Sequence, residues 1–562
     1  MNLQRSLYEF ILLTFVFTLA MCIGFAATTS GPGVNSDAAV YISMGANIHR
    51  GLGFVTDITE ANSPLSYRPV TTWPPAYSIL IAGLMNFGLD AVEAARWSSI
   101  LSFGVLGCAV YWLGHVVAGR AAGMLASLST ILLMPVARTA TFALTEITFI
   151  AFSVLAIVGM VQFARSAEKT PLLWLVVSGV FTALTILTRY VGGIWLLVGL
   201  FIIFLVTIKA WKRWLASSIL FGTIALLPAL PWFIRNARLT GQFSGMDRSV
   251  GYHPMLSENL RYFIGTYARD LIPPMHLGIR GIVQSVPFYG WLLLLAVGTG
   301  TIIWLWHVGV GRFLYNTAIR VQTDFKQWQE PFFLWTVVFI YAFGYAAVIF
   351  LLSNRSLFPA YDWPRYLTPT YPLILILWST GWVALFKVIS YGWPNWSRSL
   401  AVALPTLLWL LPYGNQTVGF IQQAAKGQEY TSVEWQQSQV IHELAAIISP
   451  DDRIYSDSPG VLSFRLAHPA RYLPHTEARE EFVDLIYQTN QLKGNQYVII
   501  FTGPLENTDP YFNTRLTGVD IAIIAANRSD IQIVGEFEDG VIYQLGHPSG
   551  ATMSSPENNR TF

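Results

Sequence analysis

Long apolar stretches alternate with short charged segments along the first three quarters of the chain. A helix needs about 20 apolar residues to cross a bilayer. Runs of that kind lie near residues 7–27, 93–117, 121–137, 147–164, 172–188, 191–208, 214–235, 287–307, 331–353, 366–386 and 399–415. The pattern therefore predicts a polytopic α-helical membrane protein with about eleven transmembrane helices.

Two apolar segments allow a second interpretation. Residues 7–27 could be a signal peptide, but the run is long and no Ala-x-Ala-like site clearly follows, which favours a retained first span. Residues 75–89 are short for a span and begin after two prolines, so we expect an interfacial or re-entrant piece. Whether residues 75–89 count as a full span decides on which side of the membrane every later loop lies.

Lysine and arginine collect in alternate loops, which is typical of the cytoplasmic side. This bias predicts a multi-pass protein of the plasma or inner membrane with a cytoplasmic N-terminus. The opposite face then receives residues 28–74, the long loop 236–286 and everything after about residue 416.

Composition agrees with a membrane protein, because 53% of the residues are hydrophobic and only 12% are charged, against about 25% in soluble domains. Residues 431–562 hold 17 acidic and 8 basic side chains, which leaves 15 and 26 for residues 1–430. Topogenic loops explain the basic excess, so no nucleic-acid partner is expected. The two cysteines lie in apolar runs, which excludes a disulfide framework.

The chain changes character near residue 430. A helix-like stretch at 433–448 and strand-like runs at 453–455, 496–501, 531–536 and 540–545 predict a small α/β extracytoplasmic domain. The expected domains are therefore a membrane domain at 1–429, this α/β domain at 430–548 and a polar, disordered tail at 549–562.

Asp37 lies about ten residues beyond the first apolar run. A carboxylate at a membrane surface can act as a general base when a substrate hydroxyl comes within hydrogen-bond reach. An ordinary structural role is also open, because Ser36 or Asp37 could cap a helix over residues 38–50.

Glu146 begins an otherwise uncharged span, where an unpaired carboxylate is expensive. It needs a partner or water, although a glutamate at a helix N-terminus is also favoured by the helix dipole. Arg189 lies between two apolar runs at a tight outer turn, where snorkelling to lipid phosphates is the alternative role.

Arg365 stands among aromatic residues and prolines at the mouth of a span. Aromatic belts explain such rings, yet an arginine fork also binds phosphate groups through paired hydrogen bonds. Gathered on one face with Arg138 and Arg189, it would offer a phosphate-binding patch beside a carboxylate base.

No P-loop, no Gly-x-Ser-x-Gly and no dinucleotide fingerprint occurs in the sequence. An ATP-driven transporter is therefore disfavoured. The long loop at 236–286 is rich in polar and basic residues, and loops of this length are usually functional or disordered. A cover over a site for a lipid headgroup is one use of such a loop.

The chain resembles the GT-C superfamily of membrane glycosyltransferases, in particular the bacterial branch similar to protein O-mannosyltransferases and to the aminoarabinose transferase of lipid A. The resemblance rests on six segments in order along the chain: SDAAVYISMGANIHRGLGF, WPPAYSILIAGL, ARTATFALTEITF, LTRYVGGIWLL, WPRYLTPTYP and YSDSPGVLSFRLAHPARYLP. These segments span most of residues 1–475.

The resemblance implies an inverting transfer from a polyprenyl-phosphate sugar to an acceptor hydroxyl on a glycan, lipid or protein. Asp37 would deprotonate or orient that hydroxyl, Glu146 would be a second acidic residue, and Arg365 would contact the phosphate. The residues expected to position donor or acceptor lie in the same segments: Tyr41, Trp73, Tyr190 and Tyr366.

This sequence departs from some relatives, which place an acid-lysine pair before the double proline, whereas Thr72 and Trp73 stand here. The departure weakens an assignment to aminoarabinose or to protein mannosylation. The outer loops contain no Asp-x-Asp, so the resemblance does not extend to the divalent metal of the oligosaccharyltransferase branch, although such a metal is compatible with the fold.

A transporter or flippase of lipid-linked glycans is the main competing function, since it also needs many spans and outer basic residues. Inverted repeats would favour it, and none is evident. A non-catalytic scaffold, in which Asp37 only caps a helix, is a third interpretation.

Overall fold

The computed structural model of the chain describes residues 3–61, 63, 66–165, 171–208, 210–246, 256–271, 325–353, 363–389, 394–475, 494–505 and 515–545. It divides into two compact units. The first contains Met1–Thr29, Thr71–Leu80 and Glu93–Ala425, and the second contains Ser30–Val70, Ile81–Val92 and Lys426–Phe562.

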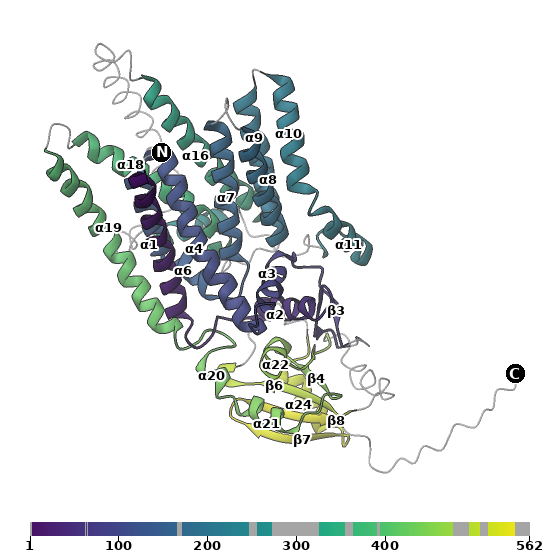
Figure 1. Cartoon of the computed structure of the whole chain (residues 1–562). Helices are drawn as coiled ribbons and strands as arrows, with labels where there is room; N and C mark the ends of the chain where they lie inside the picture. Colours follow the sequence, from purple (N-terminus) through teal and green to yellow (C-terminus); the bar gives the residue numbers. More distant parts are fainter. Residues whose placement is uncertain are drawn as a thin grey trace. The chain divides into compact units, whose positions relative to one another are not determined.

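The first unit is helical (Figure 1). Its helices are α1 (Leu3–Ala27), α4 (Ala91–Ala118), α5 (Arg120–Ile131), α6 (Met134–Thr141), α7 (Glu146–Arg165), α8 (Pro171–Thr188), α9 (Gly193–Thr207), α10 (Trp211–Leu226), α11 (Leu230–Thr240), α12 (Leu256–Leu271), α16 (Phe325–Ser353), α17 (Trp363–Leu367), α18 (Tyr371–Ile389) and α19 (Asn395–Ala424), with short 3₁₀ turns η1 (Tyr190–Gly192) and η5 (Thr368–Thr370). Helix α3 (Ala76–Met85) is shared, because its residues from Ile81 onward belong to the second unit. Helices α7 to α10 run side by side.

Among the described residues, five helices are long and apolar enough to cross a membrane, or seven if each bent pair forms one span. The chain is therefore a multi-pass membrane protein. The span expected at 287–307 lies outside the described residues, so the count of eleven stays a prediction. The short apolar helix α3 lies where a re-entrant or interfacial piece was expected.

Two stretches predicted as single spans are bent in the structure. Helices α5 and α6 meet at 59°, and α10 and α11 meet at 53°. Proline explains both bends, because it removes a backbone donor and clashes with the preceding turn. Pro135 lies in the first turn of α6, and Pro228 lies in the break before α11.

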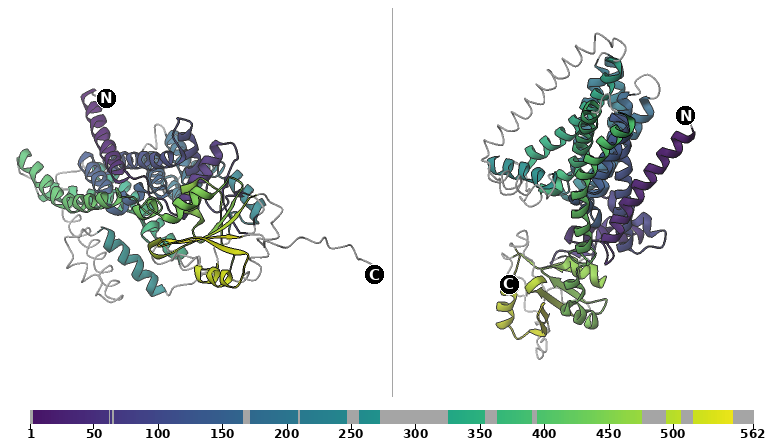
Figure 2. Two further views of the ribbon diagram at one scale, coloured as in Figure 1. Left: turned by 90° about the horizontal axis from the view of Figure 1, so that it is seen from below. Right: turned by 90° about the vertical axis from the view of Figure 1, so that its left-hand side faces the viewer.

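The second unit is built on a sheet with the strand order β2-β5-β4-β6-β8-β7. Its strands are β2 (Ile58–Thr59), β5 (Ala470–Tyr472), β4 (Arg453–Ser456), β6 (Gln496–Phe501), β8 (Gly540–Leu545) and β7 (Ile531–Phe537). The first four are mutually parallel, whereas β8 and β7 run antiparallel to their neighbours. Figure 2 shows these strands with the helices of the same unit beside them.

The residues of β6 alternate between two apolar layers, as the period of a strand requires. Ile499 and Phe501 pack with helices α21 (Gln439–Ile447) and α22 (Pro459–Leu466). Val498 and Ile500 face the layer that contains α24 (Gly518–Ala526). The sheet is therefore covered by helices on both faces.

The first-loop segment belongs to this second unit, which corrects the predicted division of the chain. Residues 28–74 were assigned to the membrane domain, yet α2 (Ser36–His49) and β2 fold with residues after 426. The physical reason is strand pairing: Ile58 and Thr59 pair in parallel with Ala470 and Arg471 and form one edge of the sheet. A small antiparallel pair, β1 (Val55–Thr56) with β3 (Arg68–Pro69), flanks β2.

The runs at 453–455, 496–501, 531–536 and 540–545 coincide with β4, β6, β7 and β8. The single helix expected at 433–448 is instead α20 (Val433–Gln436) followed by α21. Ser438 causes the interruption, because its side chain accepts a hydrogen bond from the Ile441 amide and caps a new helix. The tail at 549–562 lies outside the described residues.

Helices α4 and α5 approach so closely that only glycine fits between them. A Cβ on Gly123 would lie 2.5 Å from the Tyr111 carbonyl oxygen, and a Cβ on Gly114 would lie 2.8 Å from the Gly123 Cα. Small residues at such contacts let membrane helices pack backbone to backbone. The pair therefore sets the distance between these two helices.

We predict that Gly123→Ala destabilises the protein by about 2 kcal/mol, because backbone atoms must move to admit the methyl group. Thermal unfolding in detergent measures the change. Gly222→Ala is the matched control, since a Cβ there has nothing within 4 Å. Equal unfolding midpoints for the two variants would contradict the predicted close approach.

Candidate functional site

Glu146 is the first residue of α7 and is only 3% exposed. Its Oε1 accepts hydrogen bonds from Arg189 Nη1 and from Arg365 Nε. Arg189 also donates to Thr145 Oγ1 at 3.3 Å. The structure thus brings together three residues that the sequence singled out, from α7, from the start of η1 and from α17.

The exposed fractions of these side chains increase outward from the carboxylate. The side chain of Glu146 is 4% exposed, that of Arg189 is 15% exposed and that of Arg365 is 26% exposed. One carboxylate and two guanidinium groups leave a net charge of one positive unit. We call these three residues the Glu146 cluster.

Tyr366 extends this cluster. The Arg189 guanidinium carbon lies 5.7 Å from the centre of the Tyr366 ring, within the range of a cation–π contact. Arg138, by contrast, is exposed, and its guanidinium lies 5.8 Å from the Phe142 ring. No ion pair between Arg138 and Glu146 occurs among the described residues, so its expected place in a shared phosphate patch stays a prediction.

Tyr190 follows Arg189 directly and holds a different segment. Its hydroxyl donates to the Thr71 carbonyl oxygen at 2.9 Å. The same hydroxyl oxygen accepts from Trp232 Nε1 at 2.8 Å and from Asn236 Nδ2 at 2.9 Å. The adjacent residues Arg189 and Tyr190 therefore connect the start of α7 and the Thr71 backbone to the same turn.

Thr71 is fixed from a third direction. The Asn236 amide group donates to the Thr71 carbonyl oxygen at 3.1 Å, and the Thr71 hydroxyl donates to the Gly245 carbonyl oxygen at 3.1 Å. Gly245 has a φ of +75°, and a Cβ there would lie 2.1 Å from the Thr71 carbonyl oxygen. The segment that leads into Trp73 is thereby held beside Tyr190, while a positioning role for Trp73 stays a prediction.

Sequence reasoning missed Thr71, Trp232 and Asn236 in this network. Asn236 is fully buried in α11, and a buried amide needs hydrogen-bond partners. Arg235 and Arg238 flank this asparagine, so the local sequence gave no signal that it would be buried. The long loop was singled out for its basic residues, whereas the contacts come from its first, uncharged residues.

Helix α12, from the same long loop, supports the arginine of α17. Phe263 packs edge-on against the buried Trp363 with ring centres 5.6 Å apart. The Tyr371 hydroxyl donates to Asp270 Oδ2 at 2.6 Å and fixes the end of α12. Because Trp363 and Arg365 share one short helix, these contacts position Arg365.

Asp37 belongs to the second unit and is partly buried in the first turn of α2. The expected cap at Ser36 or Asp37 is wrong, because Asn35 fills that position and accepts a hydrogen bond from the Ala38 amide at 3.0 Å. Asp37 is therefore not occupied as the cap, although its charge is favourable near a helix N-terminus. Tyr41 is 3% exposed in the same helix, and its expected role in positioning substrate stays a prediction.

A second carboxyl group of this unit, Asp457, follows β4. It accepts hydrogen bonds from the Ser456 hydroxyl at 3.0 Å and from the Phe501 amide at 3.3 Å. Burial nevertheless raises the pKa of Asp457 to about 7, because the charged form loses its hydration. Sequence reasoning quoted the segment that contains Asp457 but selected no residue from it.

Several solved structures share this fold. ArnT from Cupriavidus metallidurans, solved bound to undecaprenyl phosphate, matches with a TM-score of 0.59 and 14% identity, over 95% of this chain and 99% of that chain. The oligosaccharyltransferase AglB from Archaeoglobus fulgidus, in complex with an inhibitory peptide and a dolichol-phosphate, matches with a TM-score of 0.53 and 12% identity, over 89% and 70%. The arabinofuranosyltransferase AftD from Mycobacteria has a TM-score of 0.50 and 12% identity, over 95% and 40%.

Sequence comparison gives a shorter match. The family model of dolichyl-phosphate-mannose-protein mannosyltransferase matches residues 75–244. No curated protein shows significant similarity to the chain. The resemblance predicted from the six segments is confirmed at the level of fold, which is the GT-C fold of these membrane glycosyltransferases.

The Glu146 cluster can be tested by removing its carboxylate. We predict that Glu146→Gln destabilises the protein by about 3 kcal/mol, because two partly buried guanidinium groups lose their compensating charge. The unfolding midpoint in detergent reports the loss.

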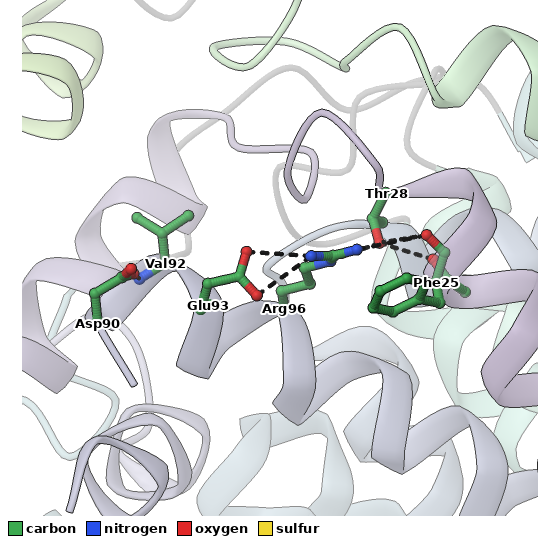
Figure 3. Close-up of polar contacts among 7 residues, drawn as sticks. Phe25, Thr28, Asp90, Val92, Glu93 and Arg96 are labelled. Carbon is green, nitrogen blue, oxygen red and sulfur yellow. Dashed lines mark hydrogen bonds and ion pairs between the residues drawn. The ribbon is translucent and has the colours of Figure 1, made fainter. Parts of the chain in front are cut away.

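Glu93→Gln is the matched control. Glu93 pairs with Arg96 at 3.2 Å, but its side chain is 38% exposed, and Arg96 also donates to Thr28 Oγ1 (Figure 3). We expect a loss of about 1 kcal/mol or less. A similar loss in both variants would contradict the special role assigned to Glu146.

Asp457 predicts a pH dependence of stability. Its pKa in the folded chain, about 7, lies above the ordinary value of 3.8, so the folded state holds this proton more tightly than the unfolded state. Stability therefore falls as the pH rises between these two values. We predict that Asp457→Asn makes the unfolding midpoint less dependent on pH in this window, and identical pH slopes for the variant and the wild type would refute this assignment.

Proposed function

We propose that the chain is an inverting glycosyltransferase that moves a sugar from a polyprenyl-phosphate donor to an acceptor hydroxyl at the extracytoplasmic face. The observation that carries the proposal is the Glu146 cluster, in which one carboxylate holds two partly buried arginines. The fold around it is shared with proteins that were solved with undecaprenyl phosphate and dolichol-phosphate. The family match at residues 75–244 supports the same chemistry, because it covers Glu146 and Arg189.

The charge of the cluster suits this donor. A polyprenyl-phosphate sugar is a phosphodiester with one negative charge, and the cluster has one positive charge in excess. Guanidinium groups bind phosphate oxygens through charge-assisted hydrogen bonds, which are stronger than neutral ones. We assign Arg365 and Arg189 to the donor phosphate, and we assign Tyr366 to holding the Arg189 guanidinium in place.

Glu146 then orients the two arginines. The sequence suggested an acidic residue of the catalytic site, but a carboxylate shared by two guanidinium groups is a poor proton acceptor. Its proposed role is to hold both side chains in fixed positions before the donor binds. Such preorganised charge stabilises the negative charge that develops on a departing group.

Asp37 is assigned to the acceptor. It accepts the proton of the acceptor hydroxyl while that oxygen attacks the anomeric carbon of the sugar. The bond from the anomeric carbon to the phosphate oxygen breaks, and its electron pair leaves with the lipid phosphate. A single displacement of this kind inverts the anomeric configuration. The supporting observation is that Asn35, not Asp37, caps α2.

The competing transporter or flippase would bind the same lipid phosphate and move it without breaking the glycosidic bond. No observation in the described residues favours it over transfer. The departure at Thr72 and Trp73 argues against assigning the sugar preferences of those relatives to this chain.

We predict that Asp37→Asn lowers kcat for transfer by at least about 100-fold, because a general base typically contributes that much. Donor affinity should change by less than about twofold, since Asp37 is not assigned to the phosphate. Incorporation of radiolabelled sugar from polyprenyl-phosphate donors into a membrane extract measures the rate. Asp451→Asn, an exposed aspartate of the same unit, is the control expected to keep wild-type transfer, and full activity of Asp37→Asn would disprove the assigned role.

A further inference from the structure

The segment YSDSPGVLSFRLAHPARYLP was noted in the sequence, yet the proposed function gives it no role. In the structure it forms β4, α22 and β5 of the second unit. Its strand β5 pairs with β2 from the first loop. The first loop and a segment about 400 residues later along the chain therefore fold against each other.

Asp57 links the helices of these two segments. Its Oδ1 accepts a hydrogen bond from Ser43 of α2 at 2.6 Å and another from Ser463 of α22 at 2.9 Å. Ser43 and Ser463 are both buried. Helix α2, which carries Asp37, is therefore fixed to α22 by a carboxylate that bridges them.

Gly460, in α22, lies against the first turn of α2. A Cβ on Gly460 would lie 3.6 Å from the Ser36 Cα and 3.3 Å from both Cε2 and the hydroxyl oxygen of Tyr430. Ser36, the residue next to Asp37, and the Tyr430 phenol thus both lie within 4 Å of the position that a Gly460 side chain would take. A methyl group at Gly460 would require the phenol to shift by a few tenths of an ångström.

The backbone around Tyr430 is also fixed to the segment that precedes Asp37. The Tyr430 amide donates to the Val34 carbonyl oxygen at 2.8 Å, and the Thr431 hydroxyl donates to the Pro32 carbonyl oxygen at 2.9 Å. The turn requires Gly427, whose φ is +96° and where a Cβ would lie 2.0 Å from the Thr431 carbonyl oxygen.

The Tyr430 phenol stays neutral next to several carboxylates. Burial raises the pKa of Tyr430, and Tyr472, Glu429, Asp457 and Asp37 raise it further. A phenol that keeps its proton is a hydrogen-bond donor at every physiological pH. Burial also raises the pKa of Tyr472, where Asp37 and Glu60 act in the same direction and Arg68 and Arg515 oppose them.

We propose that Tyr430 is a positioning residue for Asp37 and that Gly460 provides the space for it, so that residues 430–475 complete the acceptor-activating part of the enzyme. This inference rests on the proposed role of Asp37. In this proposal residues 430–475 fix the helix that carries the general base and supply a neutral phenol to orient it.

The test compares Tyr430→Phe with Tyr543→Phe in the full-length protein. Tyr543 is a buried tyrosine of β8 in the same sheet and serves as the matched control. We expect Tyr430→Phe to lower kcat about 10-fold with the donor KM within about twofold, because only the orientation of the base is lost. Gly460→Ala should act in the same direction, and Tyr543→Phe should keep wild-type kcat.

A second measurement needs no activity. In a double-mutant cycle, the unfolding midpoint shift of Asp37→Asn with Tyr430→Phe should differ from the sum of the two single shifts if the groups interact. Additive shifts together with an unchanged kcat for Tyr430→Phe would overturn the inference while leaving the proposed function intact. If the wild type transfers no sugar, the proposed function fails, and the cycle alone decides whether Tyr430 and Asp37 are coupled.

Discussion

A carboxylate at the start of an apolar helix must find compensating charge, and this requirement organises the first unit. Glu146 obtains it from Arg189 and Arg365, which lie 43 and 219 residues away along the chain. Each arginine is in turn fixed by neighbours that have no charge: Tyr190 hydrogen-bonds Thr71 beside the first, and Trp363 packs on α12 beside the second. The cost of burying one carboxylate is thereby offset by two guanidinium groups, which leave one positive charge in excess.

The second unit follows a different constraint, the pairing of strands. The first loop is too short to form its own core, and it contributes α2 and β2 to a sheet whose other strands come from the end of the chain. Asp37 therefore depends on residues about 400 positions later for its surroundings. In the proposed reaction the donor depends on arginines held by a buried ion pair, and the acceptor depends on a helix held by a sheet edge.

The sequence was most informative where a physical rule acts locally. Apolar length located α4, α7 and α16, and short strand-like runs located β6 and β8, because the residues of a span or a buried strand are themselves apolar. The expense of an isolated charge singled out Glu146 and Arg189 before any contact was known. The cap at Asn35 is local, since its partner amide lies only three residues further on, and it was missed because the adjacent Ser36 and Asp37 are also good capping residues. The roles of Thr71, Asn236 and Tyr430 could not be predicted in this way, because each depends on a partner brought close only by the fold.

The proposed reaction cleaves a lipid-phosphate sugar at its anomeric carbon, whereas a flippase would move the same molecule across the membrane intact. The most direct measurement uses purified protein in vesicles with a sugar-labelled polyprenyl-phosphate donor and follows both products together. We expect one free polyprenyl phosphate for each labelled acceptor, with the anomeric configuration inverted. Intact donor appearing on the opposite leaflet without free polyprenyl phosphate would contradict the proposed reaction and establish a flippase.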